Sequence, residues 1–451
     1  MPDLSLHPRG LAGEAVATLC LALPLVAGQL AQMAGGVVEV MLAGHLNAEV
    51  LGAVAVGNSV WMLPLMTLVG VMMAVSPSVA QLDGARRRGE TPALFVQAAW
   101  IAVVLGTALG AAVFCAGPAL ADLAGIDPAL HAGVRGFLRA VGPGAPAVGL
   151  FLACRGLCDG LSRTRVSMGF ALLGLAVLAP LGWVLMYGRL GFPPLGAAGA
   201  GVATAAMCWV QSLALLAWLR LSPATAGLGW VGLRLRPDPA VLGALLRLGV
   251  PMAVSVLLEV GMFSTAALLI ARFGPAAVAG HQIAMNVASL CFMVPLGLGM
   301  AITVRVGNAV GRADPAGVRR AVTAGLALVL VTQAVSCGLL LGLPRAIAGL
   351  YTTDPAVLGA AAGLLLLAAI FQFSDGIQVA AAGALRGLKD TRVPMLITAI
   401  SYWGVGMPAG LYFAFGAGLR TPGLWIGLIA GLTVAAGLLS ARLHRRTVLR
   451  G

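Results

Sequence analysis

The sequence predicts an all-α polytopic membrane protein whose twelve transmembrane helices form two pseudo-symmetric six-helix lobes. Three observations support this fold class. Of the 451 residues, 60% are hydrophobic and only 10% are charged, whereas a soluble domain carries about 25% charged residues. Long apolar segments recur along the whole chain, separated by short polar stretches. The second half of the chain also repeats motifs of the first half at a constant offset.

The offset of the repeat is 227 residues, the distance from Asp127 to Asp354. Asp127-Pro128 recurs as Asp354-Pro355, and Thr164-Arg165-Val166 recurs as Thr391-Arg392-Val393. Pro24 and Pro251 open equivalent apolar segments. A duplicated helical bundle is a common plan of secondary transporters, in which a substrate site lies between two repeats.

The apolar segments predict the helices in order, because a spanning helix needs about 20 such residues. They are expected at 15–43, 50–76, 93–117, 131–155, 166–187, 195–219, 242–271, 277–304, 318–342, 356–383, 394–415 and 422–442. The segments are continuous apolar runs rather than alternating ones, which excludes a transmembrane β-barrel.

The helices group into a first lobe at 1–220 and a second lobe at 242–451, which ends in a short basic tail. The link between them, 221–241, is the longest polar stretch and is expected in the cytoplasm. Six helices per lobe is an even number, so both copies enter the membrane in the same direction. The two lobes are therefore expected to be related by an axis along the membrane normal, with a cavity between them.

The net charge of +13 does not indicate a nucleic-acid partner, because most of the arginines fall on one predicted side of the membrane. Those on the opposite side are few: Arg189, Arg272, Arg345 and Arg420. An excess of Lys and Arg in short loops marks the cytoplasmic side. We expect both termini in the cytoplasm, and we expect these cations to hold the topology and to contact anionic lipid.

Three carboxylates fall well inside apolar segments, namely Glu39, Glu259 and Asp375. A charged group at membrane depth costs about 2.5–3.5 kcal/mol on insertion scales. Gln32 precedes Glu39 by two helical turns and shares its helix face. One interpretation is a carboxylate set that binds a driving cation or proton. The other is a structural hydrogen bond, which is the interpretation we favour for Glu14 and Asp159, with Asp159 paired to a nearby arginine.

The buried carboxylates do not follow the repeat. At the 227-residue offset Glu259 corresponds to Gln32, Glu39 to Ala266 and Asp375 to Val148. The fold is therefore expected to be duplicated while its charges are not. Two further polar side chains, Gln282 and Asn286, lie one turn apart on one helix face, where they could line a cavity or bridge helices.

These motifs resemble the multidrug and toxic compound extrusion (MATE) family, and within it the NorM-like branch. The most specific block runs from Pro251 to Asp314 and includes Gly280-His281-Gln282-Ile-Ala-Met-Asn286. A second block runs from Gln378 to Thr391, and the first lobe has Glu39-Val-Met-Leu-Ala-Gly44 and Pro77-Ser-Val-Ala-Gln81. The resemblance covers nearly the whole chain.

The resemblance implies a bacterial inner-membrane antiporter that is not an enzyme and exports cationic amphipathic drugs or toxins in exchange for H⁺ or Na⁺. It implies no cofactor beyond that ion, membrane lipid as a partner, and a monomer. The residues it assigns fall into two groups. Ion coupling is implied for Glu259, Asp375 and Glu39, with Glu259 and Asp375 as candidate ligands of Na⁺. The substrate cavity is implied for Gln282, Asn286, Gln32 and Phe371.

The chain departs from the family pattern in three places. Glu39 stands where the branch usually has an aspartate, Phe371 stands where some relatives have a tyrosine, and 174–183 lacks the usual asparagines. A flippase for lipid-linked sugars of a related fold is an alternative, although it would be expected to have a cationic cavity. The sequence contains no Gly-x-x-x-x-Gly-Lys-Ser/Thr loop and no Gly-x-Ser-x-Gly elbow, which argues against ATP-driven pumping and against a hydrolase.

Overall fold

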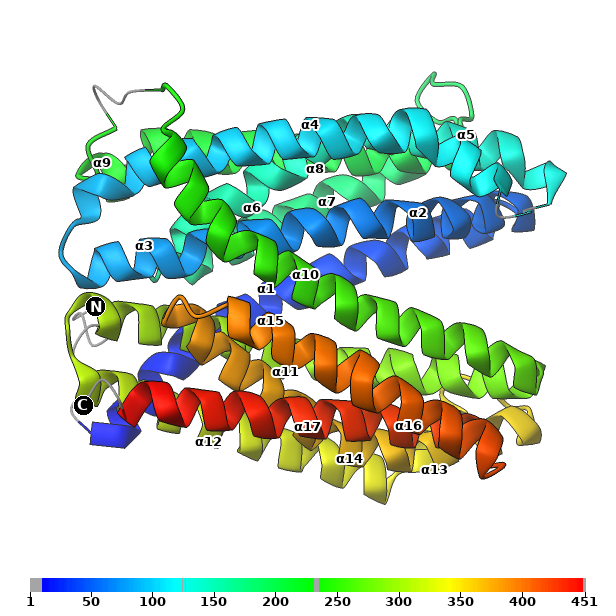
Figure 1. Cartoon of the computed structure of the whole chain (residues 1–451). Helices are drawn as coiled ribbons and strands as arrows, with labels where there is room; N and C mark the ends of the chain where they lie inside the picture. The colour runs from blue at the N-terminus through cyan, green and yellow to red at the C-terminus, as the bar shows by residue number, and fades with distance from the viewer. Residues whose placement is uncertain (1–9, 124, 126, 231–234, 449–451) are drawn as a thin grey trace. The chain divides into compact units, whose positions relative to one another are not determined.

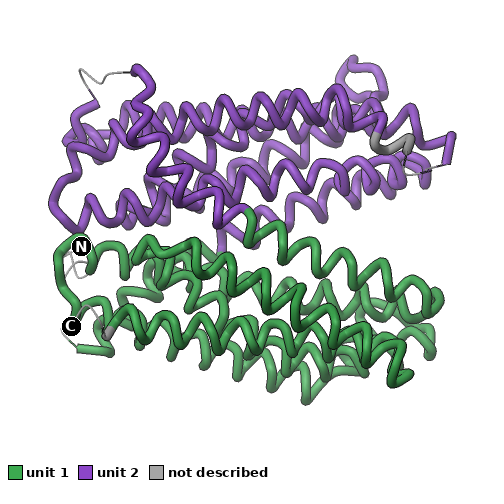
Figure 2. Tube along the Cα trace, viewed as in Figure 1, with its two compact units in different colours: residues 1–26, 254–451 green, residues 27–253 purple. Residues whose placement is uncertain are grey.

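The computed structural model describes residues 10–123, 125, 127–230 and 235–448, and in these ranges the regular structure is helical throughout. The chain divides into two compact units (Figure 2). Unit 1 comprises residues 1–26 and 254–451, and unit 2 comprises residues 27–253. Arg9, Arg234 and Arg450, which we assigned to the cytoplasmic side, lie outside the described residues.

Unit 2 is a bundle of long helices that run alongside one another (Figure 1). It contains most of α1 (Gly10–Leu46) and then α2 (Ala48–Met72), α3 (Val75–Gly84), α4 (Thr91–Leu123), α5 (Pro128–Val141), α6 (Ala145–Gly160), α7 (Thr164–Tyr187), α8 (Ala197–Leu221) and α9 (Pro223–Ala226). The short 3₁₀ turn η1 (Arg88–Glu90) precedes α4, and the 3₁₀ turn η2 (Gly142–Gly144) joins α5 to α6.

Unit 1 has the same kind of construction and begins with the larger part of α10 (Pro239–Ile270) and the turn η3 (Ala271–Phe273). It continues with α11 (Pro275–Gly311), α12 (Pro315–Gly342), α13 (Pro344–Gly349), α14 (Pro355–Gly387), α15 (Arg392–Ala399), η4 (Ile400–Gly406), α16 (Met407–Leu411), η5 (Tyr412–Gly416) and α17 (Arg420–Val448). Here η4 and η5 are π-helices. Within this unit, α1 begins and α17 ends at the same end of the bundle (Figure 1).

The predicted fold class is confirmed. In the described part of the chain, eleven helical segments are long and apolar enough to cross a membrane. The segment predicted at 394–415 is helical as well, but it alternates between α15, η4, α16 and η5, so no single helix in it is long enough. Large apolar side chains point outward from these helices, and Leu268 is 74% exposed and Leu23 is 66% exposed, as expected for surfaces that face lipid.

The two compact units exchange helix halves relative to the sequence repeat. The division passes after Val26 within α1 and after Ala253 within α10, and these two positions are equivalent at the 227-residue offset. Pro24 and Pro251 lie two residues before the two division points. A proline in a helix removes one backbone hydrogen bond and bends the helix or breaks it. We infer that the duplicated proline marks the point at which each helix leaves one bundle for the other.

The repeated motifs build equivalent helix ends. Asp127 Oδ1 accepts a hydrogen bond from the Ala129 backbone N–H at 2.9 Å, and Asp354 Oδ1 accepts one from the Ala356 N–H at 2.8 Å. The following proline occupies the first position of α5 and of α14. An aspartate cap followed by proline satisfies free N–H groups and presets the backbone for a helix. The Asp-Pro repeat therefore starts the same helix in both copies.

The backbone also repeats at helix C-termini. Non-glycine residues with left-handed φ occur at Ser162 (61°) and at its equivalent Lys389 (57°). The Arg163 N–H donates to Cys158 O at 2.8 Å, and the Asp390 N–H donates to Leu385 O at 2.9 Å. This six-to-one hydrogen bond with a left-handed residue is the Schellman motif, which usually uses glycine. The duplication thus preserves a strained turn as well as the helices around it.

Helices α11 and α14 approach each other closely at a pair of glycines. A Cβ at Gly383 would collide with the carbonyl oxygen of Gly299, and Thr303 Oγ1 donates to Gly383 O at 2.9 Å across the same contact. Small residues allow membrane helices to pack with their backbones close together. This contact holds the part of α14 that follows Asp375 against α11.

We expect Gly383→Ala to destabilise unit 1 by about 1–3 kcal/mol, because the added methyl overpacks the contact. Gly363→Ala on the same helix is the matched control, since nothing lies within 4 Å of a Cβ there and alanine favours a helix over glycine by about 1 kcal/mol. Unfolding in a denaturing detergent titration measures both variants. Equal stability of the two variants would contradict the close-packing interpretation.

Candidate functional site

Two of the predicted carboxylates meet in unit 1. Glu259 lies half-buried on α10, and Asp375 lies on α14 with only 3% of its surface exposed. The two side chains are near enough to interact electrostatically. Like charges in an apolar setting strongly disfavour joint ionisation. A bound cation therefore relieves the repulsion between the two carboxylates. Carboxylate oxygens bind both protons and metal ions, so either kind of cation can serve.

Three further polar groups are linked to this carboxylate pair, directly or through one another. Arg386, three turns after Asp375 on α14, interacts electrostatically with Glu259. Tyr402, on the π-helix η4, interacts with both carboxylates and faces Gln378. Sequence reasoning did not assign these residues to the site. For Gln378 a signal existed, because it follows Asp375 by three residues and so shares its helix face.

Phe371 lies in the core of unit 1, one turn before Asp375. Its ring makes edge contacts with Phe263 and Trp425, each with ring centroids 6.0 Å apart. Trp425 Nε1 in turn donates to Nδ1 of the buried His281 at 3.2 Å. Phe371 is only 4% exposed, so it packs within the apolar core of unit 1 rather than presenting a free aromatic face.

The third predicted carboxylate, Glu39, lies in unit 2 and has partners of its own. Its Oε1 accepts from Thr204 Oγ1 at 3.0 Å, and its Oε2 accepts from Asn58 Nδ2 at 3.2 Å. The side chain is 7% exposed. Donors from α2 and α8 thus hold the carboxylate of α1 in place. Neither donor was predicted from the sequence. Gln32, two turns before Glu39 on the same helix, is exposed.

The amides of α11 lie together as expected from their spacing. Asn286 Nδ2 donates to the backbone carbonyl of Gln282 at 3.1 Å, and both residues are exposed. Asparagine that bonds the preceding turn in this way keeps its side-chain oxygen available. Gln282 and Asn286 therefore belong to the same unit as Glu259 and Asp375, while Gln32 belongs to the unit of Glu39.

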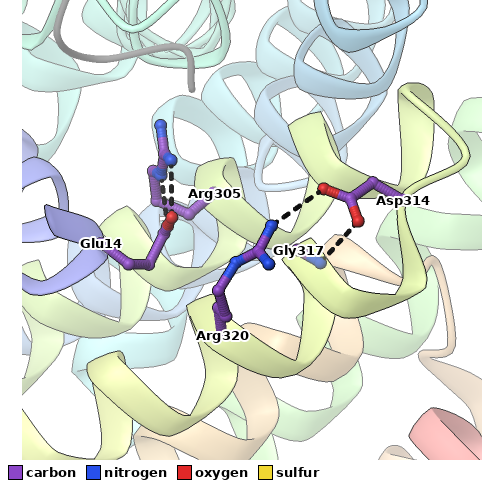
Figure 3. A network of polar contacts seen from close by, with 5 residues as sticks. All are labelled: Glu14, Arg305, Asp314, Gly317 and Arg320. Atoms are coloured by element: carbon purple, nitrogen blue, oxygen red, sulfur yellow. Dashed lines mark hydrogen bonds and ion pairs between the residues drawn. The ribbon is translucent and has the colours of Figure 1, made fainter. Parts of the chain in front are cut away.

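The two carboxylates assigned to structural roles are paired with arginines. Glu14 on α1 accepts two hydrogen bonds from Arg305 on α11, at 2.7 and 2.9 Å, and both side chains are buried (Figure 3). Asp159 lies 3.4 Å from Arg155 and accepts from Ser167 Oγ at 2.6 Å. The predicted pairing of Asp159 with a nearby arginine is confirmed.

The MatE family model matches residues 24–184 and 251–411, two stretches that are again offset by 227 residues. A protein of Xanthomonas campestris pv. campestris named "Probable multidrug resistance protein NorM" is 47% identical over 434 residues, which cover 96% of this chain and 94% of the relative. "Multidrug resistance protein PmpM" of Pseudomonas aeruginosa is 39% identical over 437 residues, which cover 95% and 90%.

Solved structures show the same fold at low sequence identity. The crystal structure of the eukaryotic MATE transporter AtDTX14 has a TM-score of 0.84 at 20% identity and covers 97% of this chain and 99% of that one. A MATE crystallised in complex with MaD3S has a TM-score of 0.89 at 20% identity, with 100% and 99% covered. Together with the family model and the close relatives, these findings show that the chain belongs to the MATE family, in its NorM-like branch.

Proposed function

We propose that this protein is a secondary active multidrug efflux antiporter of the bacterial inner membrane, with both termini in the cytoplasm. It exports cationic amphipathic compounds in exchange for H⁺ or Na⁺ by alternating access. The observation that carries the proposal is the pair of interacting carboxylates, Glu259 and Asp375, within apolar helices of unit 1. The names of the relatives, multidrug resistance proteins NorM and PmpM, support the substrate class.

The exchange follows from competition for charge. With the carboxylates free of the coupling ion, a cationic drug is attracted to them, and the exposed amides of Gln282 and Asn286 offer hydrogen bonds. When H⁺ or Na⁺ binds the carboxylates from outside, it neutralises that attraction and the drug leaves. Linkage requires the drug to weaken ion binding by the same factor.

The number of oxygen ligands that the site needs depends on the coupling ion. A proton needs only a carboxylate that can release it again. Na⁺ needs several oxygen ligands, and the groups near the pair include an amide, Gln378, and a phenol, Tyr402. Among the described residues no cluster of three or more His, Cys, Asp or Glu side chains could hold a metal ion, so neutral oxygens would have to complete a sodium site.

Transport in proteoliposomes tests the proposal. Uptake of tetraphenylphosphonium, a lipophilic cation, is measured under a proton gradient alone and under a sodium gradient alone. Movement driven by protons alone identifies H⁺ as the coupling ion, and movement that requires sodium identifies Na⁺ as the coupling ion. Absence of movement under both gradients, with folded protein, would contradict drug antiport and favour a lipid flippase.

A further inference from the structure

Tyr402 is fully buried in the core of unit 1, although its side chain carries a hydroxyl. It belongs to the same hydrophobic cluster as Met262 of α10 and Phe371 of α14. Met262 lies one turn after Glu259 and Phe371 lies one turn before Asp375, so the phenol is enclosed at the level of the carboxylate pair.

The helix that carries Tyr402 is held against α10 next to Glu259. Trp403 Nε1 donates to the backbone carbonyl of Leu258 at 3.2 Å. On the other side, the cluster is closed by apolar residues of α17, Leu428 and Leu432. Short π-helical segments are rare and are frequent at functional sites. The position of the phenol is therefore fixed by neighbours rather than left to a flexible loop.

The Tyr402 hydroxyl has charged neighbours and no committed acceptor. It interacts electrostatically with Glu259 and Asp375 and faces Gln378. Within the described ranges, neither Tyr402 Oη nor Gln378 Oε1 makes a hydrogen bond of acceptable geometry. A buried polar group without a partner carries a desolvation cost that a ligand or a rearrangement can relieve.

The charges that act on this hydroxyl come from two helices. Glu259 belongs to α10, and Asp375 belongs to α14, which also carries Arg386, the cation that interacts electrostatically with Glu259. The residues that α16 and α17 add to the cluster are Met407, Leu428, Leu432 and Ala435, which carry no charge. The hydroxyl is thus placed to respond to the charge of the carboxylate pair.

We propose that Tyr402 is a third member of the cation site, donating a hydrogen bond to the carboxylate pair when no cation is bound and offering its oxygen to a bound Na⁺. This inference rests on the proposed ion-coupled export and adds a residue to the coupling site. It predicts opposite effects on the two ions. Without the hydroxyl, the anionic pair loses a stabilising donor and binds protons more tightly, while Na⁺ loses one oxygen ligand and binds more weakly.

Tyr402→Phe tests the inference by equilibrium binding of tetraphenylphosphonium to the purified full-length protein. At a constant probe concentration, the pH is lowered and the midpoint pH of probe displacement is recorded. At alkaline pH, Na⁺ is added and the midpoint Na⁺ concentration of displacement is recorded. We expect the midpoint pH of the variant to rise by roughly one to two units, since a hydrogen bond to a charged group contributes about 1.5–3 kcal/mol and one pH unit is about 1.4 kcal/mol. If Na⁺ displaces the probe from the parent protein, a higher Na⁺ concentration should be needed to displace it from the variant.

Tyr412→Phe is the matched control, because Tyr412 lies on the neighbouring π-helix η5 and is 66% exposed. It should leave both midpoints as in the parent protein. Two results for the midpoint pH of Tyr402→Phe would overturn the inference: no change, or a shift to lower pH. Loss of probe binding at every pH would overturn it too, because it would show that Tyr402 supports the fold alone. If neither ion displaces the probe from the parent protein, the proposed antiport itself fails, and this inference falls with it.

Discussion

Glu259→Gln is expected to abolish ion-driven efflux while the protein remains folded. Glutamine has the shape of glutamate but can neither carry a negative charge nor take up a proton at neutral pH. The substitution leaves Asp375 without its interacting carboxylate, so the cation is no longer needed to relieve the pair. Transport under an imposed gradient should fall by at least about 100-fold, because coupling between two ligands typically changes affinity by about 5- to 150-fold.

The sequence repeat provides an argument that the variant folds. Gln32 occupies the position of the first copy that is equivalent to Glu259, and α1 forms a continuous helix through it. A glutamine is therefore compatible with this place in the fold. Thermal denaturation of the purified variant should match that of the parent protein.

Glu49→Gln is the matched control for the loss of charge. Glu49 lies exposed in the first turn of α2, in the other unit. Its variant should transport as well as the parent protein under both proton and sodium gradients. Full gradient-driven transport by Glu259→Gln would remove this residue from the coupling mechanism.

The fold could be predicted from the sequence because its determinants are local or periodic. Apolar length predicts a membrane span, and the repeat predicts equivalent helix ends, as Asp127 and Asp354 show by capping α5 and α14 in the same way. The exchange of helix halves between the compact units could not be predicted, because it depends on which bundle each half of α1 and α10 packs against. Pro24 and Pro251 were local signs of it.

The site could be predicted only in part, for a related physical reason. Isolated carboxylates in apolar segments stand out in one dimension, and Glu259, Asp375 and Glu39 were found in that way. Their partners come from distant segments, since Thr204 lies 165 residues from Glu39. A threonine or asparagine in a spanning helix is common enough to carry no signal until the fold places it beside a charge.

Tyr402 illustrates a second limit. Helical faces are assigned from a sequence with 3.6 residues per turn, whereas the π-helix η4 forms hydrogen bonds from residue i to i+5. This wider turn rotates every following side chain relative to the α-helical expectation. The direction of Tyr402 therefore could not be derived from its spacing to Pro394 or Pro408, even though the segment itself was correctly expected to be helical.

The buried ion pair between Glu14 and Arg305 leads to the largest expected effect on stability. The pair joins the first part of α1 to α11 within unit 1, through two hydrogen bonds between side chains that are 4% and 1% exposed. Arg305→Met leaves the Glu14 carboxylate buried without its cation. Removing one partner of such a pair costs about 3–5 kcal/mol, which a denaturing detergent titration should resolve.

A neighbouring pair supplies the control. Arg320 lies 3.3 Å from Asp314, but their side chains are 39% and 33% exposed (Figure 3), and exposed ion pairs contribute about 0–1 kcal/mol. Arg320→Met should therefore lower the stability of unit 1 far less than Arg305→Met. Asp314 is left unchanged in this control because it also caps α12 by accepting from the Gly317 N–H at 2.7 Å.

The double variant Glu14→Leu/Arg305→Met separates the cost of an unpaired charge from the contribution of the pair. Apolar replacement of both partners of a buried pair is often neutral or stabilising, so the double variant should regain most of the stability that Arg305→Met loses. The coupling between the two substitutions should then be large and favourable, as it is for residues in direct contact. If the stability losses of the two single variants simply added in the double variant, the ion pair would not be the source of the effect. The packing of α1 against α11 would then be the source.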